Sequence, residues 1–139
     1  MKYKQTLLAL LLSIAAVSAS AETSVIVSNS NSNGSIDKST VSKIFLGKSK
    51  SFPDGSQAIP IDQDDSSPVR DAFNSSLLGK SASQLKSYWS RLIFTGKGTP
   101  PKQSGDDAGV KALVANNPNM IGYIDSSAVD ASVKVVHKF

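Results

Sequence analysis

Apolar residues recur along the chain with two spacings, which alternate from one segment to the next. Short β-branched or apolar runs with polar flanks predict buried strands. Runs with apolar residues three or four positions apart predict helices. Strands are expected at 23–29, 58–63, 120–125 and 132–139, and helices from Asp37 to Gly47, from Ser66 or Ser67 to Gly79, from Ser83 past Leu92 and from Ser104 past Val114. Strands interleaved with helices predict a single α/β domain built around a small sheet.

Two residues carry more specific expectations. Pro60 has no backbone N–H, so it favours an edge position or a strand end for the second strand. Trp89 shares a helical face with Leu85 and Leu92, which predicts that its ring lies mostly in the core. Truncation of an aromatic side chain in a core to alanine typically costs ~3–5 kcal/mol.

The first 21 residues have the organisation of a cleavable signal peptide. Lys2 and Lys4 form a basic beginning, an apolar run follows from Leu7 to Val17, and Ala19-Ser20-Ala21 matches a small-residue cleavage site. The apolar run is shorter than the ~20 residues that a membrane-spanning helix needs. We therefore expect a signal peptide at 1–21 and a periplasmic domain at 22–139, with no membrane span in the mature form.

Composition narrows the function classes. The formal charge of +4 includes Lys2 and Lys4, and without them it is +2. No stretch concentrates basic residues with aromatic ones, so nothing indicates nucleic-acid binding. The absence of cysteine excludes disulfides and a lipoprotein anchor.

Familiar catalytic and metal-binding motifs do not fit. The phrase Gly-Lys-Ser occurs twice, but Ser42 and Asn74 stand where a P-loop needs its first glycine. Counted from Asp62, the sixth and twelfth positions of an EF-hand loop would be Ser67 and Phe73, so calcium is rejected as well. The single histidine, His137, has no cysteine to activate and no partner that the sequence identifies. We expect no enzyme activity and no cofactor.

The stretch DDSSPVRDAF, residues 64–73, supports two interpretations. In the first, Ser66 or Ser67 caps a helix, Pro68 takes the first helical position, and Arg70 faces water. In the second, the free N–H groups of the first turn and the serine hydroxyls bind an oxyanion, with Arg70 as a clamp. The acids Asp64 and Asp65 repel anions, so the second reading requires one of them to accept a proton that the ligand carries. The spacing alone leaves both readings open.

Several phrases of the chain resemble periplasmic phosphate-binding proteins, the receptors of phosphate ABC transporters. The resemblance covers nearly all of 24–125 and is strongest with small single-domain relatives of these receptors. The matching phrases are Ile44-Phe45-Leu46-Gly47, Asp54-Gly55, Ile59-Pro60, Tyr88-Trp89, Leu92, Phe94 to Pro101, and IGYID at 121–125. The resemblance implies an α/β fold like one lobe of a type 2 periplasmic binding protein, with a small mixed sheet flanked by helices.

The phosphate loop is where the chain departs from that family. The family has approximately Arg-x-Asp-Gly-Ser-Gly-Thr before a helix, whereas this chain has neither the arginine nor the glycines. Asp64 and Ser66 occupy matching positions, and Ser67 and Arg70 are local substitutes. The resemblance thus implies a ligand site made of these four residues, with phosphate or a related oxyanion as ligand.

Two functions of different classes follow. The first is a periplasmic solute-binding-like protein that binds phosphate or a similar oxyanion for an ABC transporter or a sensing system. Its partner would be a transporter permease or another envelope protein. The second is a non-catalytic cell-envelope interaction module that kept the fold and lost the ligand site. The retained Asp64 and Ser66 favour the first, and the missing arginine and glycines favour the second.

Overall fold

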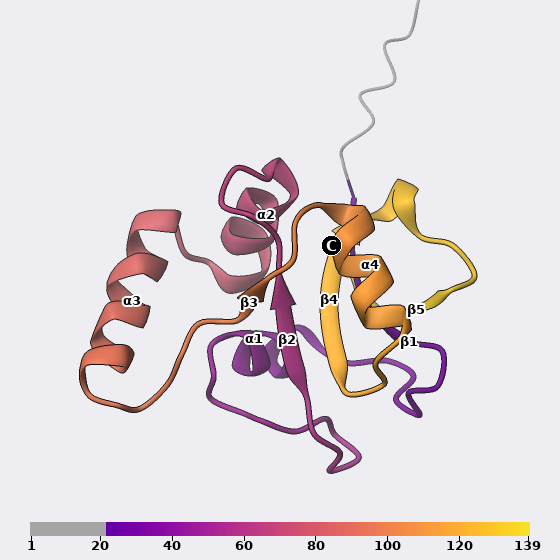
Figure 1. Ribbon diagram of the computed structural model, residues 1–139, viewed down its shortest axis with the longest axis horizontal. Coiled ribbons are helices and arrows are strands. Elements are labelled where there is room, and N and C mark those ends of the chain that lie inside the picture. Colours follow the sequence, from indigo (N-terminus) through magenta and orange to yellow (C-terminus); the bar gives the residue numbers. More distant parts are fainter. Residues whose placement is uncertain (1–21) are drawn as a thin grey trace, which may run out of the picture.

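A computed structural model describes residues 22–139, and the expected signal peptide at 1–21 lies outside the described residues. Five strands form one mixed sheet in the order β3-β2-β4-β1-β5 (Figure 1). The strands are β1 (Thr23–Ser28), β2 (Ile59–Asp62), β3 (Lys102–Gln103), β4 (Met120–Asp125) and β5 (Val133–Lys138). The helices are α1 (Lys38–Phe45), α2 (Pro68–Phe73) with its π-helical continuation η1 (Asn74–Leu78), α3 (Ala82–Phe94), α4 (Asp107–Ala115) and the short 3₁₀ helix η2 (Ser126–Ala128).

The sheet combines antiparallel and parallel pairing. β1 lies between β4 and β5 and runs antiparallel to both. β2 runs parallel to β4 on one side and to β3 on the other. The mixed α/β architecture expected from the alternating pattern is therefore confirmed.

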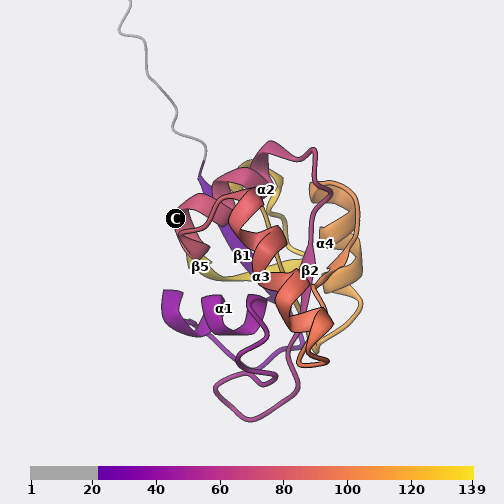
Figure 2. The same ribbon diagram turned by 90° about the vertical axis from the view of Figure 1, so that its left-hand side faces the viewer.

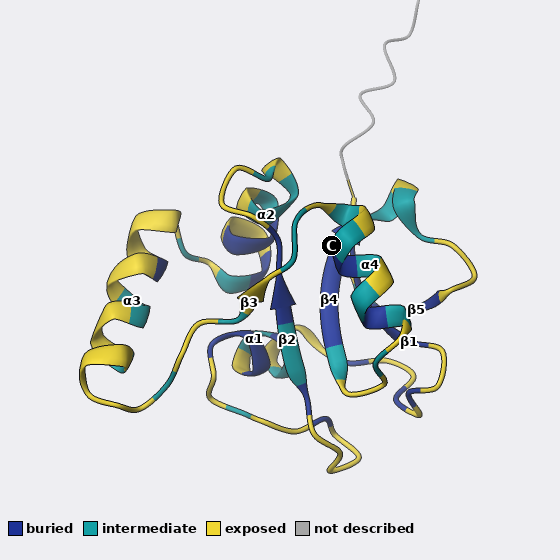
Figure 3. Ribbon diagram, in the orientation of Figure 1, coloured by how far each residue is buried: buried dark blue, intermediate teal, exposed yellow. Residues whose placement is uncertain are grey.

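Side chains of the strands alternate between two apolar layers, as the period of two in a strand requires. Val25, Val27 and Tyr123 point to one face and pack with α1 and α2. Ile26 and Ile124 point to the other face and pack with α4. Burial is concentrated in these layers around the sheet (Figure 3). Among the helices of residues 22–139, none combines the length and apolar character that a bilayer crossing needs.

Helix boundaries follow the capping residues, with two corrections. Asp37 caps α1 through the Thr40 N–H, and Gly79 takes a left-handed φ of 65° after η1, both as expected. α3 begins earlier than predicted, because Ser81 rather than Ser83 caps it in a reciprocal capping box with Gln84. α4 is capped by Asp106 and not by Ser104.

Pro60 does not mark an edge strand, because β2 is the second strand of the sheet, but it lies near a strand end, the other position that was expected, since it is the second residue of β2. β3 pairs only with Ile61 and Asp62, so Pro60 lies outside that ladder. Its missing N–H therefore interrupts no pairing with β3.

α3 is the helix that departs most from the expected core. Trp89 is half-buried rather than buried, whereas Leu85 on the same helix is buried. The sheet carries α1 and α2 on one face and α4 on the other, and α3 stands beside these layers (Figures 1 and 2). Within residues 22–139, no second layer therefore covers Trp89.

α4 approaches β4 closely at Gly122. A Cβ atom at this position would lie 2.5 Å from Val110 Cγ1 and 3.2 Å from Val114 Cγ2. Valine side chains are stiff and both valines are buried, so neither can move aside without cost.

We expect Gly122→Ala to lower the free energy of unfolding by ~1–3 kcal/mol, the usual cost of overpacking a core. Gly34→Ala is the matched control, since nothing lies within 4 Å of the added methyl group there. Urea unfolding of the two variants measures the difference. Equal stability of the two would show that α4 does not pack this closely on β4.

Candidate functional site

The turn between β2 and α2, together with the first turn of α2, contains all four residues predicted for the ligand site: Asp64, Ser66, Ser67 and Arg70. Ser67 is the N-cap of α2, and its Oγ accepts a hydrogen bond from the Arg70 N–H at 3.2 Å. Pro68 holds the first helical position and Asp71 lies in the first turn. The capping expected from DDSSPVRDAF is confirmed, with Ser67 rather than Ser66 as the cap.

Gln63 anchors this turn to both layers of the fold. Its side chain is buried, and its Oε1 accepts a hydrogen bond from Ser67 Oγ at 2.5 Å. Its Nε2 donates to Asp107 Oδ1 at 2.7 Å and to the Tyr123 carbonyl at 3.0 Å. One amide group thereby joins the start of α2, the start of α4 and the strand between them.

Arg70 is held inside the site and does not face water, so that part of the capping reading is wrong. Its side chain is 17% exposed, and Nη2 lies 3.4 Å from Asp62 Oδ2. Nη1 donates to the Gln63 carbonyl at 3.0 Å and to Asp65 Oδ1 at 2.6 Å. The two carboxylates differ in setting, because Asp65 is 85% exposed whereas Asp62 is 11% exposed.

A buried carboxylate and phenol lie beneath Arg70. The Tyr123 hydroxyl donates to Asp62 Oδ1, which also accepts the Gln63 N–H at 3.0 Å. Burial raises the pKa of Asp62 above its ordinary value, against the opposing effects of Tyr123 and Arg70. Burial and the neighbouring Asp62 also raise the pKa of Tyr123, so its hydroxyl stays a donor. The ring of Tyr123 stacks on Phe73 with centroids 3.9 Å apart.

Asp64 and Ser66 have different surroundings. Asp64 joins the turn to the loop before α4: its N–H donates to the Gly105 carbonyl at 2.9 Å, and its Oδ1 accepts the Gly105 N–H at 3.2 Å. Ser66 is exposed, and within residues 22–139 neither its hydroxyl nor its amide has a hydrogen-bond partner. The amide of Val69 is also without a partner in that part of the chain. Three donors are thus available to a ligand.

The structure therefore separates the predicted residues into two groups. Asp64, Ser67 and Arg70 are engaged in the fold, whereas Ser66 has donors without a partner among residues 22–139. Sequence reasoning did not identify Gln63 and Tyr123 as parts of the site, and it considered Asp62 only as a calcium ligand. The one sequence signal for Gln63 was an amide side chain at the end of the expected strand at 58–63. Among the described residues, no cluster of acidic side chains and histidine could hold a metal ion.

We expect Arg70→Ala to lower the free energy of unfolding by ~3 kcal/mol near pH 7, because it leaves the buried Asp62 carboxylate without its cation. A raised folded-state pKa means that the folded protein binds the proton more tightly. The contribution of Asp62 protonation to the free energy of unfolding is complete below pH ~4. It is lost as pH rises through the raised pKa of Asp62. The penalty of Arg70→Ala should therefore shrink as pH falls from 7 toward 4.

Urea unfolding at several pH values measures this penalty. Asp65→Asn serves as the control, because an exposed ion pair contributes only ~0–1 kcal/mol. A penalty that is small at pH 7, or that does not change with pH, would contradict the role given to the pair of Arg70 and Asp62.

Solved structures of other proteins share this fold. No protein-family model matches the chain, and no curated protein matches it in sequence. Among solved structures, one from Clostridium perfringens, described as a phosphate ABC transporter substrate-binding protein with bound phosphate, superimposes with a TM-score of 0.67. It is 25% identical, and the match covers 84% of this chain and 45% of that one.

Two further structures share the fold. An ABC-type phosphate transport receptor from Vibrio cholerae has a TM-score of 0.65 at 19% identity, with 84% of this chain and 46% of that chain covered. PstS from Borrelia burgdorferi has a TM-score of 0.60 at 14% identity, with coverage of 84% and 47%. This chain therefore spans less than half the length of the proteins it matches. It is a small structural relative of the phosphate ABC transporter substrate-binding proteins.

Proposed function

We propose that this protein is a periplasmic solute-binding-like protein that binds phosphate or a related oxyanion at the start of α2. The observation that carries the proposal is the fold shared with a substrate-binding protein that holds phosphate. The unpaired donors of Ser66 and Val69 at the same helix start support it. Amide groups at a helix N-terminus, with the positive end of the helix dipole, favour an anion.

The donors define how an oxyanion would be held. The hydroxyl and amide of Ser66 and the amide of Val69 would donate to its oxygens. Arg70 would contribute Nη1 if the exposed Asp65 carboxylate gave up its bond at 2.6 Å, and Asp62 would keep Nη2 in place. The exposed Asp64 would accept a proton from a protonated phosphate. A fully ionised anion meets only repulsion from that carboxylate.

The rest of the function is proposed from the relatives. Those proteins are described as parts of ABC transport, so this chain would deliver its ligand to a transporter permease or to a sensing system and would catalyse no reaction. Because the chain matches less than half of each relative, it would supply only one wall of the ligand site. Solvent, a second copy or a partner would supply the other wall.

We expect phosphate to bind the wild-type protein and Ser66→Ala to weaken binding about tenfold or more, since a hydrogen bond to a charged group contributes ~1.5–3 kcal/mol. Asp65→Asn should strengthen binding, because it removes a repelling charge and frees Arg70. Titration calorimetry with phosphate and with sulfate measures both effects. Ser67→Ala and Arg70→Ala are less informative, because both residues also hold the fold.

Ser39→Ala, an exposed serine on α1, is the matched control for the loss of a hydroxyl. It should leave the affinity unchanged. If millimolar phosphate produces neither heat nor a shift in melting temperature with the wild-type protein, binding at this site is refuted.

We expect the exported protein to begin at Glu22, because Ala19-Ser20-Ala21 has the small residues that signal peptidase requires. Intact-mass measurement and N-terminal sequencing of periplasmic material give the start residue. Ala19→Lys should leave the precursor uncut and attached to the membrane. A wild-type product that still begins at Met1 would contradict periplasmic release.

A further inference from the structure

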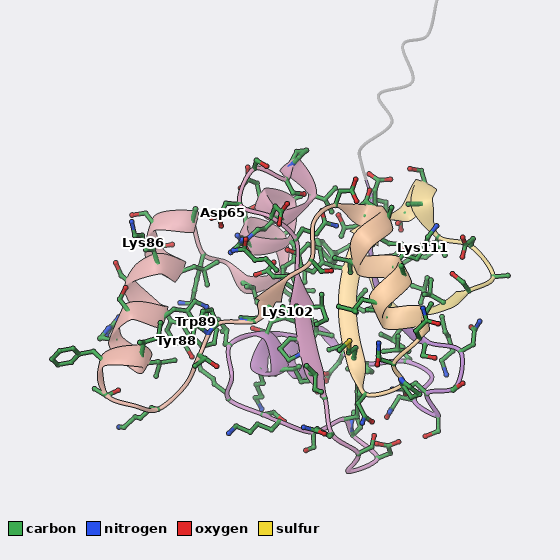
Figure 4. All side chains as sticks on the ribbon, viewed as in Figure 1. Asp65, Lys86, Tyr88, Trp89, Lys102 and Lys111 are labelled. Atoms are coloured by element: carbon green, nitrogen blue, oxygen red, sulfur yellow. The ribbon has the colours of Figure 1, made fainter. Side chains whose placement is uncertain are left out.

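α3 has few attachments to the rest of the fold. The Tyr88 hydroxyl donates to the Leu46 carbonyl at 2.6 Å, and a Cβ at Gly47 would lie 3.3 Å from the Trp89 ring. These contacts join one side of the helix to the end of α1. Figure 4 shows Tyr88 and Trp89 on the side of α3 that faces the molecule, with Lys102 across from them on β3. Beyond this contact, Ile93 is 54% exposed and Phe94 is 92% exposed.

An open groove separates α3 from the body of the protein. Trp89, Leu92 and Ile93 form its helical wall, and Ile59 and Pro60 belong to the facing wall. The groove has a volume of about 610 Å³, in the range of sites that bind ligands through apolar contacts. An apolar, concave surface of this size fits side chains that enter it from outside.

The rim of the groove carries only positive charge. Lys50, Lys97 and Lys102 line it, and no aspartate or glutamate does. The sequence around α3 has the same bias: five basic residues and no acidic residue lie between Asp71 and Asp106. No ion pair within residues 22–139 uses any of these five side chains. The groove thus combines an apolar floor with uncompensated cations.

We propose that this groove binds an acidic segment of a partner protein, which inserts apolar side chains beside Trp89 and places carboxylates on the lysine rim. Charge complementarity identifies the class of partner, since acidic groups steer toward such a rim and pair with it. The same rim opposes a symmetric contact between two copies of this groove, because that contact would place lysines against lysines. An anionic membrane is flat and would engage the protruding Phe94, not the concave floor.

Trp89 provides a direct readout, because it is the only tryptophan of the chain and lines the groove. Peptides of 12 residues would be selected from a random displayed library against the purified protein, and binders titrated by Trp89 fluorescence. We expect enriched peptides to pair Asp or Glu with Leu, Ile or aromatic residues. Their binding should shift Trp89 emission to shorter wavelength and weaken with added salt, since exposed charges are screened.

Two variants test the geometry, each with a control. Lys97→Glu combined with Lys102→Glu should weaken the peptide about tenfold, because two exposed attractions become repulsions. Lys138→Glu, the same reversal on β5, should leave affinity unchanged. Ile93→Ser should weaken binding about fivefold or more through lost apolar contact. Phe94→Ser on the same helix should not, because Phe94 does not line the groove.

Other results overturn the inference. The selection could fail to enrich acidic peptides, or the Lys97→Glu/Lys102→Glu protein could bind the peptides as well as the wild type does. The protein could also form a concentration-dependent dimer that buries Trp89. Alternatively, the wild-type protein could sediment with vesicles that contain one-third phosphatidylglycerol. If Phe94→Ser abolished that sedimentation, the surface would be assigned to a membrane instead. The groove does not include the four residues of the proposed oxyanion site. Failure of phosphate to bind in calorimetry would refute the oxyanion site and not the groove. Failure of peptides to bind would refute the groove and not the oxyanion site.

Discussion

The carboxylate of Asp62 at the end of β2 is the constraint on which the surrounding structure depends. A charge that is 11% exposed needs partners, because its removal from water costs several kcal/mol without them. Tyr123 supplies a hydroxyl from β4, Gln63 supplies its backbone N–H, and Arg70 supplies the cation from α2. Satisfying this one group therefore positions α2 against the sheet.

The same turn connects to the opposite layer through Gln63. Its side-chain amide donates to Asp107 in the first turn of α4, and the Asp107 carboxylate also accepts the Asp125 N–H at 3.1 Å. A polar network thus passes through the sheet at the carboxyl ends of β2 and β4, between the apolar layers that α1 and α2 form on one face and α4 on the other. The layers are held in register by hydrogen bonds whose geometry is more exacting than apolar contact.

Much of the fold could be predicted from the sequence, because local patterns of neighbouring residues determine most of the strands and several of the helix caps. The β-branched run of β1 and the N-cap Asp37 depend on neighbouring residues alone. The order of the strands and the position of α3 depend on contacts between distant residues, which no local pattern contains. Trp89 illustrates this: its helical face is apolar, but the sequence does not show that no layer covers it.

The candidate site was predicted only as far as its position along the chain. Ser67 was recognisable as a cap because Pro68 follows it. The engagement of Arg70 was not recognisable, because its partner Asp62 is eight residues away and lies across the turn from it. Tyr123 lies more than fifty residues further along the chain. Burial decides which of several nearby aspartates attracts the guanidinium, and burial belongs to the folded state.

The pairing of Asp64 with Gly105 has a consequence for how the sequence can vary. Together with the Ser104 N–H, which donates to the Asp62 carbonyl at 2.9 Å, it brings the two ends of a forty-residue excursion side by side. Besides α3, the excursion contains α2, which packs on the sheet, and β3, which pairs with β2, whereas α3 stands beside these layers. Insertions, deletions or other changes confined to α3 would therefore leave the pairing of the strands intact.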